Sequence, residues 1–152
     1  MVINENPRSD INQPVAGGRT RPRGRSALPE SDYYHLLVHL ETCNRDRGPR
    51  WALLTYVLQN KLMNTEPTRE PVASDIVVGG SHVSYSANGG AVETVLLVHG
   101  AQPGKRKQDI VSVSSLLGAT LIGMRVGQRA PLLCEDGSVR SLVVIDSVPP
   151  RK

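Results

Sequence analysis

The chain has few of the residues that usually build an aromatic core. Its 152 residues include no Phe, Trp51 is the single Trp, and aromatic residues make up 3% of the sequence. The core must therefore be aliphatic, and the Val, Leu and Ile residues that crowd the second half can supply it. A chain of this length accommodates one domain, or one small domain with an appendage.

Cysteines and long apolar runs are also scarce. Cys43 and Cys134 lie far apart, and neither has a CxxC partner or a metal-ligand spacing. This pattern predicts two reduced, buried thiols. No apolar run approaches the ~20 residues that cross a bilayer, and the N-terminus lacks the apolar stretch of a secretory signal. We therefore expect no membrane segment and a cytoplasmic location.

Motifs that carry chemistry are absent as well. The glycine pairs do not match the phosphate-binding patterns GxxxxGK[ST] or GxGxxG, and they are typical of hairpin turns. His35 and His39 are one helical turn apart, but no third metal ligand follows at a recognisable spacing. His82 and His99 fall at predicted strand positions without a nucleophile motif beside them. We therefore expect a protein that is not an enzyme and that uses no metal, cofactor or small-molecule substrate.

The net charge of +4 is modest, and basic residues gather in two short segments. The first is a lead, residues 1–28, whose Pro and Gly residues predict disorder. Its arginines are Arg19, Arg21, Arg23 and Arg25. We expect a solvated tail there, with weak phosphate contact to nucleic acid as the alternative. The second segment, Lys105-Arg106-Lys107, is interpreted as a solvated loop, or alternatively as a patch that docks an acidic surface.

Residues 29–66 carry the pattern of two amphipathic helices. Ser31 or Asp32 can cap the first helix, and its apolar stripe has the spacing i, i+3, i+4 and i+7. The stripe consists of Tyr33, Leu36, Leu37 and Leu40, with Cys43 extending it. The segment 44–49 predicts a turn, and a second helix follows from Pro49 to about Met63. We expect an antiparallel helical hairpin, a short coiled coil whose helices are each ~20 Å long.

Residues 68–71 are predicted to be a linker, and residues 72–150 have the texture of a β-rich domain. Short β-branched runs alternate with Gly, Asn, Pro and Asp turns. The runs are 76–78, 82–85, 92–98, 110–113, 130–134 and 139–148. One helix, expected from Ser115 to Met124 with Ser114 or Ser115 as its cap, interrupts them. The order predicts an α+β protein in which one helix packs over an antiparallel sheet.

The segment 110–127 resembles the most characteristic stretch of one known domain family. It reads Ile-Val-Ser-Val-Ser-Ser-Leu-Leu-Gly-Ala-Thr-Leu-Ile-Gly-Met-Arg-Val-Gly, with a serine-containing turn, a Gly-Ala helix and a Gly-x-x-x-Gly turn at 123–127. It is similar to the C-terminal domain shared by the GreA/GreB transcript-cleavage factors and the regulator of nucleoside diphosphate kinase (Rnk). Residues 95–98 look like the central strand of the family, and residues 32–37 look like the start of the Rnk hairpin. The resemblance covers about residues 30–150 and is closest to the Rnk branch, because the predicted hairpin is short.

This resemblance implies an FKBP-like fold for residues 72–150 and docking on RNA polymerase near its secondary channel. The docking positions that it implies are Ser112, Ser115, Leu116 and Arg125. The family commonly has a proline at the position of Leu116. FKBP-type isomerases enclose proline in aromatic rings, whereas residues 72–150 contain Tyr85 as their sole aromatic. Prolyl isomerisation is therefore not expected.

The predicted hairpin tip differs from that of the Gre factors, which carry acidic residues that help to hold a catalytic Mg²⁺. The tip residues here are Glu41, Arg45, Asp46 and Arg47. Arginines beside Asp46 oppose a second metal ion, so transcript cleavage is not expected. The sequence thus predicts a non-catalytic bacterial regulator that binds RNA polymerase. The alternative is a regulator of nucleoside diphosphate kinase, or of nucleotide metabolism, that acts through another protein partner.

Overall fold

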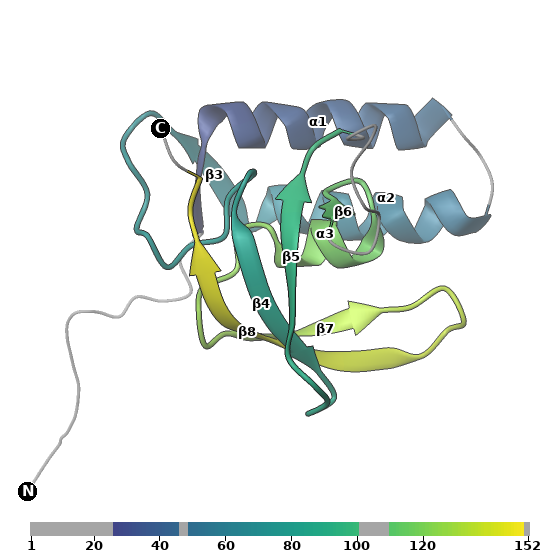
Figure 1. Cartoon of the computed structure of the whole chain (residues 1–152). Helices are drawn as coiled ribbons and strands as arrows, with labels where there is room; N and C mark the ends of the chain where they lie inside the picture. The colour runs from purple at the N-terminus through teal and green to yellow at the C-terminus, as the bar shows by residue number, and fades with distance from the viewer. Residues whose placement is uncertain (1–25, 46–48, 101–109, 151–152) are drawn as a thin grey trace, which may run out of the picture.

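The computed structural model describes residues 26–45, 49–100 and 110–150 (Figure 1). Several predicted features lie outside these ranges. They are the arginines of the basic lead, Asp46 and Arg47 of the tip, and Lys105-Arg106-Lys107. Within the described ranges the chain combines two long helices, a short helix and a curled five-stranded sheet. The α+β class predicted from the sequence is confirmed.

The two long helices are α1 (Glu30–Arg45) and α2 (Pro49–Met63), and their predicted positions are confirmed. Figure 1 shows them side by side along one side of the sheet, running in opposite directions. In α1, Leu36 and Cys43 are buried, while Leu37 is 41% exposed. The prediction that Leu37 belongs to the buried stripe is therefore wrong. The buried face of α1 is narrow, and Leu37 lies one residue, or about 100°, around the helix from Leu36.

A two-stranded parallel sheet flanks the helix pair and was not predicted. Strand β2 (Ser26–Pro29) precedes α1, and β3 (Thr65–Thr68) follows α2; the two pair in parallel from Ser26↔Thr65 to Pro29↔Thr68. Residues 26–28 are therefore part of a strand, so the boundary of the predicted disordered lead at residue 28 is wrong. Thr68 likewise belongs to β3 rather than to the predicted linker. Four-residue strands that each contain a proline carry almost no strand signal.

The main sheet has the strand order β6-β5-β4-β8-β7. Its strands are β4 (His82–Ala87), β5 (Glu93–Val98), β6 (Ile110–Ser112), β7 (Arg129–Leu133) and β8 (Val139–Val148). The pairs β4–β5, β4–β8 and β7–β8 are antiparallel, but β5–β6 is parallel. The prediction of an antiparallel sheet is wrong at that pair, because the long segment between Val98 and Ile110 replaces a tight hairpin turn.

Residues 76–78 were predicted to be a strand, and this prediction is wrong. Ile76 makes one isolated bridge to Arg125, and no named strand includes the segment. Val77 donates its N–H to Met124 O (2.8 Å) and accepts from Gly123 N–H (2.8 Å). All three residues of the segment are buried. The three apolar residues are therefore buried in an irregular segment. Hydrophobic periodicity cannot distinguish such a short buried segment from a buried strand.

One aliphatic core joins the helices to the sheet. The short helix α3 (Leu116–Leu121) lies between α2 and the sheet (Figure 1). The core is assembled from the helix pair, α3 and the inner face of the sheet. Its fully buried members include Leu28, Leu36, Leu58, Val83, Leu97, Leu121, Ile122, Met124, Leu142 and Val144. Helix α3 is shorter than the predicted Ser115–Met124 because Ile122 turns to an extended ψ of 133° and Gly123 follows with φ +84°.

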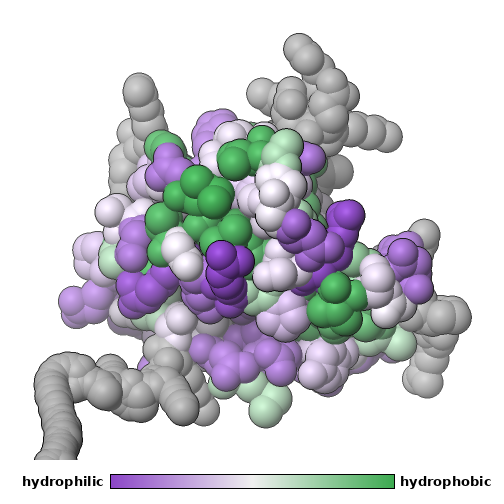
Figure 2. Space-filling model, turned by 90° about the horizontal axis from the view of Figure 1, so that it is seen from below, coloured by the Kyte–Doolittle hydropathy of each residue, from purple (hydrophilic) through white to green (hydrophobic). Residues whose placement is uncertain are grey.

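The side of the molecule away from the two long helices is shown in Figure 2. Hydrophobic residues gather there in one large patch with hydrophilic residues beside it. On the outer face of the main sheet, the register aligns Leu96, His82 and Val148 in one row, and Val148 is 54% exposed. In the part of the chain that the structure describes, no helix is long and apolar enough to cross a membrane.

Candidate functional site

The serine turn between β6 and α3 contains three of the four predicted docking residues. Of the two predicted cap candidates, Ser114 and Ser115, it is Ser115 that caps α3: its Oγ accepts from Gly118 N–H (3.1 Å) and donates to Ser112 O (2.6 Å). The Oγ of Ser112 accepts from Ser114 N–H (3.1 Å) and lies 2.8 Å from the Oγ of Ser114. The hydroxyls of this turn therefore hold its own backbone, and they fix the shape that the turn presents.

Steric constraints explain why glycine occupies three positions in and after the serine turn, Gly118, Gly123 and Gly127. A Cβ on Gly118 would overlap the carbonyl oxygen of Ser112 and lie 2.9 Å from Cα of Val113. Helix α3 can approach the end of β6 only because Gly118 has no side chain. Gly123 and Gly127 have φ values of +84° and +90°, in the left-handed region that favours glycine. The Gly-Ala helix and the Gly-x-x-x-Gly turn are thus requirements of this backbone.

Leu116 occupies the position where the resembled family commonly has proline. Ser115 has φ −123° and ψ 163°, the extended conformation that a residue before proline prefers. Leu116 is the first residue of α3, where proline is readily accommodated. The backbone therefore keeps a proline-compatible shape with Leu116 in place, held by the Ser115 cap. What changes at this position is the side chain, which is partly exposed and packs against the core.

Arg125 belongs to a different set of contacts. Its Nη1 lies 3.4 Å from both carboxylate oxygens of Asp75, and its N–H donates to Gln128 Oε1 (2.9 Å). Asp75 and Arg125 are about half exposed, so this ion pair is worth little in free energy. None of the contacts of Arg125 joins it to Ser112, Ser115 or Leu116 among the described residues.

The predicted tip residues that the structure describes are Glu41 and Arg45, near the end of α1. Arg45 Nη2 lies 3.8 Å from Glu41 Oε2, and both side chains are well exposed. This i,i+4 pair offsets the charge of the carboxylate at the end of the helix. The placement of Asp46 and Arg47 lies outside the described residues, so their role stays a prediction.

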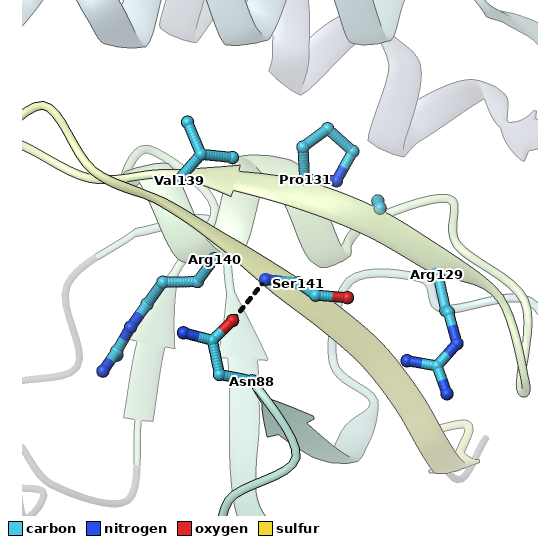
Figure 3. Close-up of a pocket in the computed structure, with 7 residues that line it drawn as sticks. Asn88, Arg129, Pro131, Val139, Arg140 and Ser141 are labelled. Atoms are coloured by element: carbon cyan, nitrogen blue, oxygen red, sulfur yellow. Dashed lines mark hydrogen bonds between the residues drawn. The ribbon is translucent and has the colours of Figure 1, made fainter.

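A shallow, open pocket of about 460 Å³ lies on the β7–β8 hairpin (Figure 3). None of the predicted docking or tip residues that the structure describes lines this pocket. The sequence did not single out this pocket, because its residues come from three separate parts of the chain.

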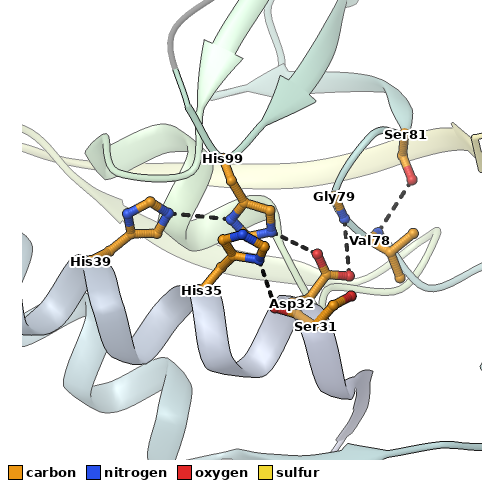
Figure 4. Close-up of polar contacts among 8 residues, drawn as sticks. All are labelled: Ser31, Asp32, His35, His39, Val78, Gly79, Ser81 and His99. Carbon is orange, nitrogen blue, oxygen red and sulfur yellow. Dashed lines mark hydrogen bonds and ion pairs between the residues drawn. The ribbon is translucent and has the colours of Figure 1, made fainter.

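Sequence reasoning also missed a polar cluster between α1 and the sheet (Figure 4). Asp32 Oδ1 lies 2.6 Å from His99 Nε2, and Asp32 Oδ2 accepts from Gly79 N–H (3.3 Å). His99 Nδ1 in turn lies 3.2 Å from His39 Nε2. Ser31 and Asp32 both lie inside the first turn of α1, so the expectation that one of them caps the helix is wrong. Asp32 lies in the first turn of α1, and its carboxylate binds the segment that follows β5 and the turn at Gly79.

The remaining histidine of the cluster stacks on His99. The rings of His35 and His99 are 4.3 Å apart and nearly parallel, and His35 Nδ1 donates to Ser31 O (2.7 Å). Burial, together with the nearby charges of His99 and His35, lowers the pKa of His39 to about 4. His39 is therefore neutral at neutral pH, and its contact with His99 is a hydrogen bond between two ring nitrogens.

The geometry of this polar cluster supports a structural role. A carboxylate–imidazole–imidazole chain can orient a base, but no hydroxyl side chain in the described ranges bonds to its three imidazoles. The described residues also contain no group of three His, Cys, Asp or Glu side chains placed to hold a metal ion. What the cluster does is join α1 to the sheet. The spacing of Asp32, His35 and His39 marks one helix face, and this was the signal available in the sequence.

One comparison with known proteins bears on the fold. No protein-family model matches the chain, and no curated protein matches it. Among solved structures, the prokaryotic transcription elongation factor GreA/GreB from Nitrosomonas europaea is similar with a TM-score of 0.59 and 17% identity, over 82% of this chain and 99% of that one. GreA factor homolog 1 of Thermus thermophilus gives a TM-score of 0.38 at 18% identity, over 81% and 98% of the two chains. Of these two likenesses, the first is high enough to show a shared fold.

Proposed function

We propose that this chain is a non-catalytic regulator that binds RNA polymerase near the secondary channel and modulates transcription. The observation that supports it is the likeness in fold to the Nitrosomonas europaea elongation factor, which extends over 99% of that chain. No large part of that protein lacks a counterpart here. In this proposal residues 72–150 form an FKBP-like docking domain, and residues 29–66 form a short helical hairpin of the Rnk type. The setting is the bacterial cytoplasm.

The docking surface in this proposal is the start of α3. Because the hydroxyls of Ser112 and Ser115 are bonded within the turn, they act through the backbone shape that they hold. Leu116 supplies a partly exposed apolar side chain at the centre of this surface. Arg125, in the turn that follows α3, adds positive charge in this proposal, since its exposed pair with Asp75 is easily exchanged for a carboxylate of a partner.

The proposal excludes stimulation of transcript cleavage. A second Mg²⁺ needs several carboxylates, and the cationic side chain of Arg45, 3.8 Å from the Glu41 carboxylate, opposes a second cation there electrostatically. With 16 residues, α1 spans about 24 Å, which limits how far it can project. We expect backtracked elongation complexes to show the same rate of RNA cleavage with and without this protein. A rate that rises with protein concentration would contradict this part of the proposal.

The direct test is binding of the full chain to bacterial core RNA polymerase at moderate salt, with and without a Gre factor. Saturable binding that the Gre factor displaces is the expected result. Absence of binding at micromolar concentrations would overturn the proposal. It would favour the alternative regulator that acts through nucleoside diphosphate kinase or another protein of nucleotide metabolism.

Two variants at one position sharpen this test. Leu116→Ala removes the proposed contact, so affinity should fall several-fold. Leu116→Pro restores the family residue on a backbone already shaped for it, so binding should be kept or strengthened. The control is Val72→Ala, which truncates another partly buried side chain that packs on the core. This variant should bind with unchanged affinity. Thermal unfolding of each variant shows whether it is folded before binding is compared.

A further inference from the structure

The pocket on the β7–β8 hairpin, whose lining residues are drawn in Figure 3, shares no lining residue with the serine turn. The register pairs Arg129 with Val143 and Pro131 with Ser141, so Arg129, Pro131 and Ser141 share one face of the two strands. Arg140 pairs with Leu132 and starts from the other face, so the two arginines flank the hairpin from different sides. Asn88, in the turn after β4, lines the pocket from a third segment of the chain. Its lining residues are Asn88, Arg129, Ala130, Pro131, Val139, Arg140 and Ser141.

Asn88 holds this pocket in a fixed shape. Its backbone N–H donates to Ser141 O (2.7 Å), and its side-chain Oδ1 accepts from Ser141 N–H (2.7 Å). Asn88 also has φ +54°, in the left-handed region. Two hydrogen bonds to one residue of β8 therefore anchor the turn to the hairpin. The Nδ2 group of Asn88 has no hydrogen-bond partner in the described part of the chain and remains available as a donor.

The two arginines of the pocket have no carboxylate partner among the residues that the structure describes. Three other arginines do have one: Arg45 pairs with Glu41, Arg69 with Glu30 and Arg125 with Asp75. Asp136 is the acid nearest to Arg140 in the sequence, but its Oδ1 already accepts from the N–H (2.9 Å) and the Oγ (2.6 Å) of Ser138. These bonds, more than Arg140, lower the pKa of Asp136. The pocket thus carries two guanidinium groups that form no ion pair within the described ranges, although the carboxylate of Asp136 attracts Arg140 at longer range.

The arrangement of the charges indicates the shape of the ligand. Figure 3 shows Arg129 and Arg140 at opposite ends, with Asn88 and Ser141 between them. Two separated guanidinium groups do not converge on one small anion, but they match an extended ligand with an acidic group at each end. A planar guanidinium binds a carboxylate through two parallel hydrogen bonds. Ala130, Pro131 and Val139 offer apolar contacts, and Val139 is 60% exposed.

We propose that this pocket binds an extended acidic segment of a protein partner, with carboxylates on Arg129 and Arg140 and apolar side chains over the β7–β8 hairpin. Recognition is through side chains rather than by adding a strand to the sheet. β7 is an edge strand, and Pro131 within it has no N–H to donate to a new strand. The site does not depend on the proposed docking to RNA polymerase.

The test uses the full chain and a short fluorescein-labelled peptide in which glutamates alternate with valines. Fluorescence anisotropy should show saturable binding, and a peptide with lysines in place of the glutamates should not bind. Arg129→Ala combined with Arg140→Ala should weaken binding by about tenfold or more, as expected for losing charge-assisted hydrogen bonds. Arg69→Ala is the control, because it removes an exposed arginine that is already paired with Glu30.

Specific outcomes would overturn the inference. One is absence of saturation at millimolar peptide. Another is an equal loss of affinity in the Arg69→Ala control, which would indicate binding through overall charge. A third is displacement of the peptide by lower concentrations of inorganic phosphate or of an oligothymidylate, which would make phosphate the ligand. Amide chemical shifts that move at Asn88, Ala130 and Ser141 on peptide addition would support the pocket, and shifts confined to other residues would contradict it.

Discussion

The carboxylate of Asp32 lies 2.6 Å from Nε2 of His99, although 67 residues separate them in the sequence. Asp32 is in the first turn of α1, and His99 immediately follows β5. Their side chains are only 8% and 16% exposed. This contact therefore joins the helix pair to the sheet at a place where little water reaches the two side chains to compete for their hydrogen bond.

We expect Asp32→Asn to lower the free energy of unfolding by about 2–3 kcal/mol, because a nearly buried charge-assisted hydrogen bond is lost. Urea denaturation at neutral pH measures this value. The matched control is Asp75→Asn, the same chemical change in an exposed ion pair with Arg125. The control should stay within about 0.5 kcal/mol of the parent protein. Equal effects of the two substitutions would show that Asp32 contributes no more than a surface carboxylate.

The pKa of His39 predicts a loss of stability in mild acid. Burial lowers this pKa to about 4, whereas the unfolded chain has a value near 6.5. Between these values the unfolded state binds the proton more readily, so the contribution of His39 is complete above about pH 6.5 and lost as the pH falls toward 4. After allowance for its partial exposure, we expect roughly 1–2 kcal/mol.

The measurement is the free energy of unfolding of the parent protein and of His39→Gln from pH 7.5 to 4.5. The parent should lose more stability over this range than the variant. Since carboxylates titrate in both proteins, the difference between the two curves isolates His39. Parallel curves would mean that the environment of His39 does not penalise its charge.

Gly118→Ala should destabilise the protein although alanine is the better helix former. Alanine gains about 1 kcal/mol of helix propensity over glycine, but its Cβ would overlap the carbonyl oxygen of Ser112. We expect the steric overlap to outweigh the gain in helix propensity, so the free energy of unfolding of the variant should fall by about 2 kcal/mol or more. Gly100→Ala is the control, because a Cβ there meets nothing within 4 Å. Thermal unfolding should separate the two variants, and a neutral Gly118→Ala would refute the close approach of α3 to β6.

Lys61 predicts a second rise of stability with pH, in the same direction as for His39 but at alkaline pH. Its Nζ donates to Thr120 O (2.8 Å), and burial lowers its pKa from 10.5 to about 8. At pH 7 the lysine is charged in both states, and above pH 8 the folded state releases the proton first. The unfolding free energy should therefore rise by roughly 1–2 kcal/mol between pH 8 and 10, after discounting for partial exposure.

A comparison with Lys61→Met isolates this effect, since cysteines and tyrosines also titrate in that range. Denaturation curves at pH 7, 8, 9 and 10 should show the rise in the parent protein and not in the variant. A rise of the same size in both would assign it to other groups and contradict the prediction.

The helices were predictable because their signals are local. The apolar period and the proline at position 49 lie within a few residues of the backbone that they shape, and the bounds of α2 agree with the prediction. The strand β8, with its β-branched residues after an Asp-Gly turn, was also predicted at its observed limits. The exposure of Leu37 was not predictable, because the spacing of apolar residues along α1 does not show how wide a face of the helix is buried.

The site residues divide in the same way. The cap at Ser115 was predictable because the Ser-x-x-Gly spacing brings the hydroxyl to the N–H of Gly118 within one turn of helix. The bond between Asp32 and His99 was not, although both residues were visible, because nothing local relates the start of α1 to the end of β5. The pocket around Asn88 was missed for the same reason.

By itself the sequence determined the aliphatic core, the two long helices, the α+β class and the serine turn, because each depends on patterns a few residues long. The tertiary structure alone decided the parallel β2–β3 and β5–β6 pairs, the irregular path of residues 76–78, and the groups that meet at His99 and around Arg129. These depend on which distant segments share one core, and that is settled by the burial of all the apolar surfaces together.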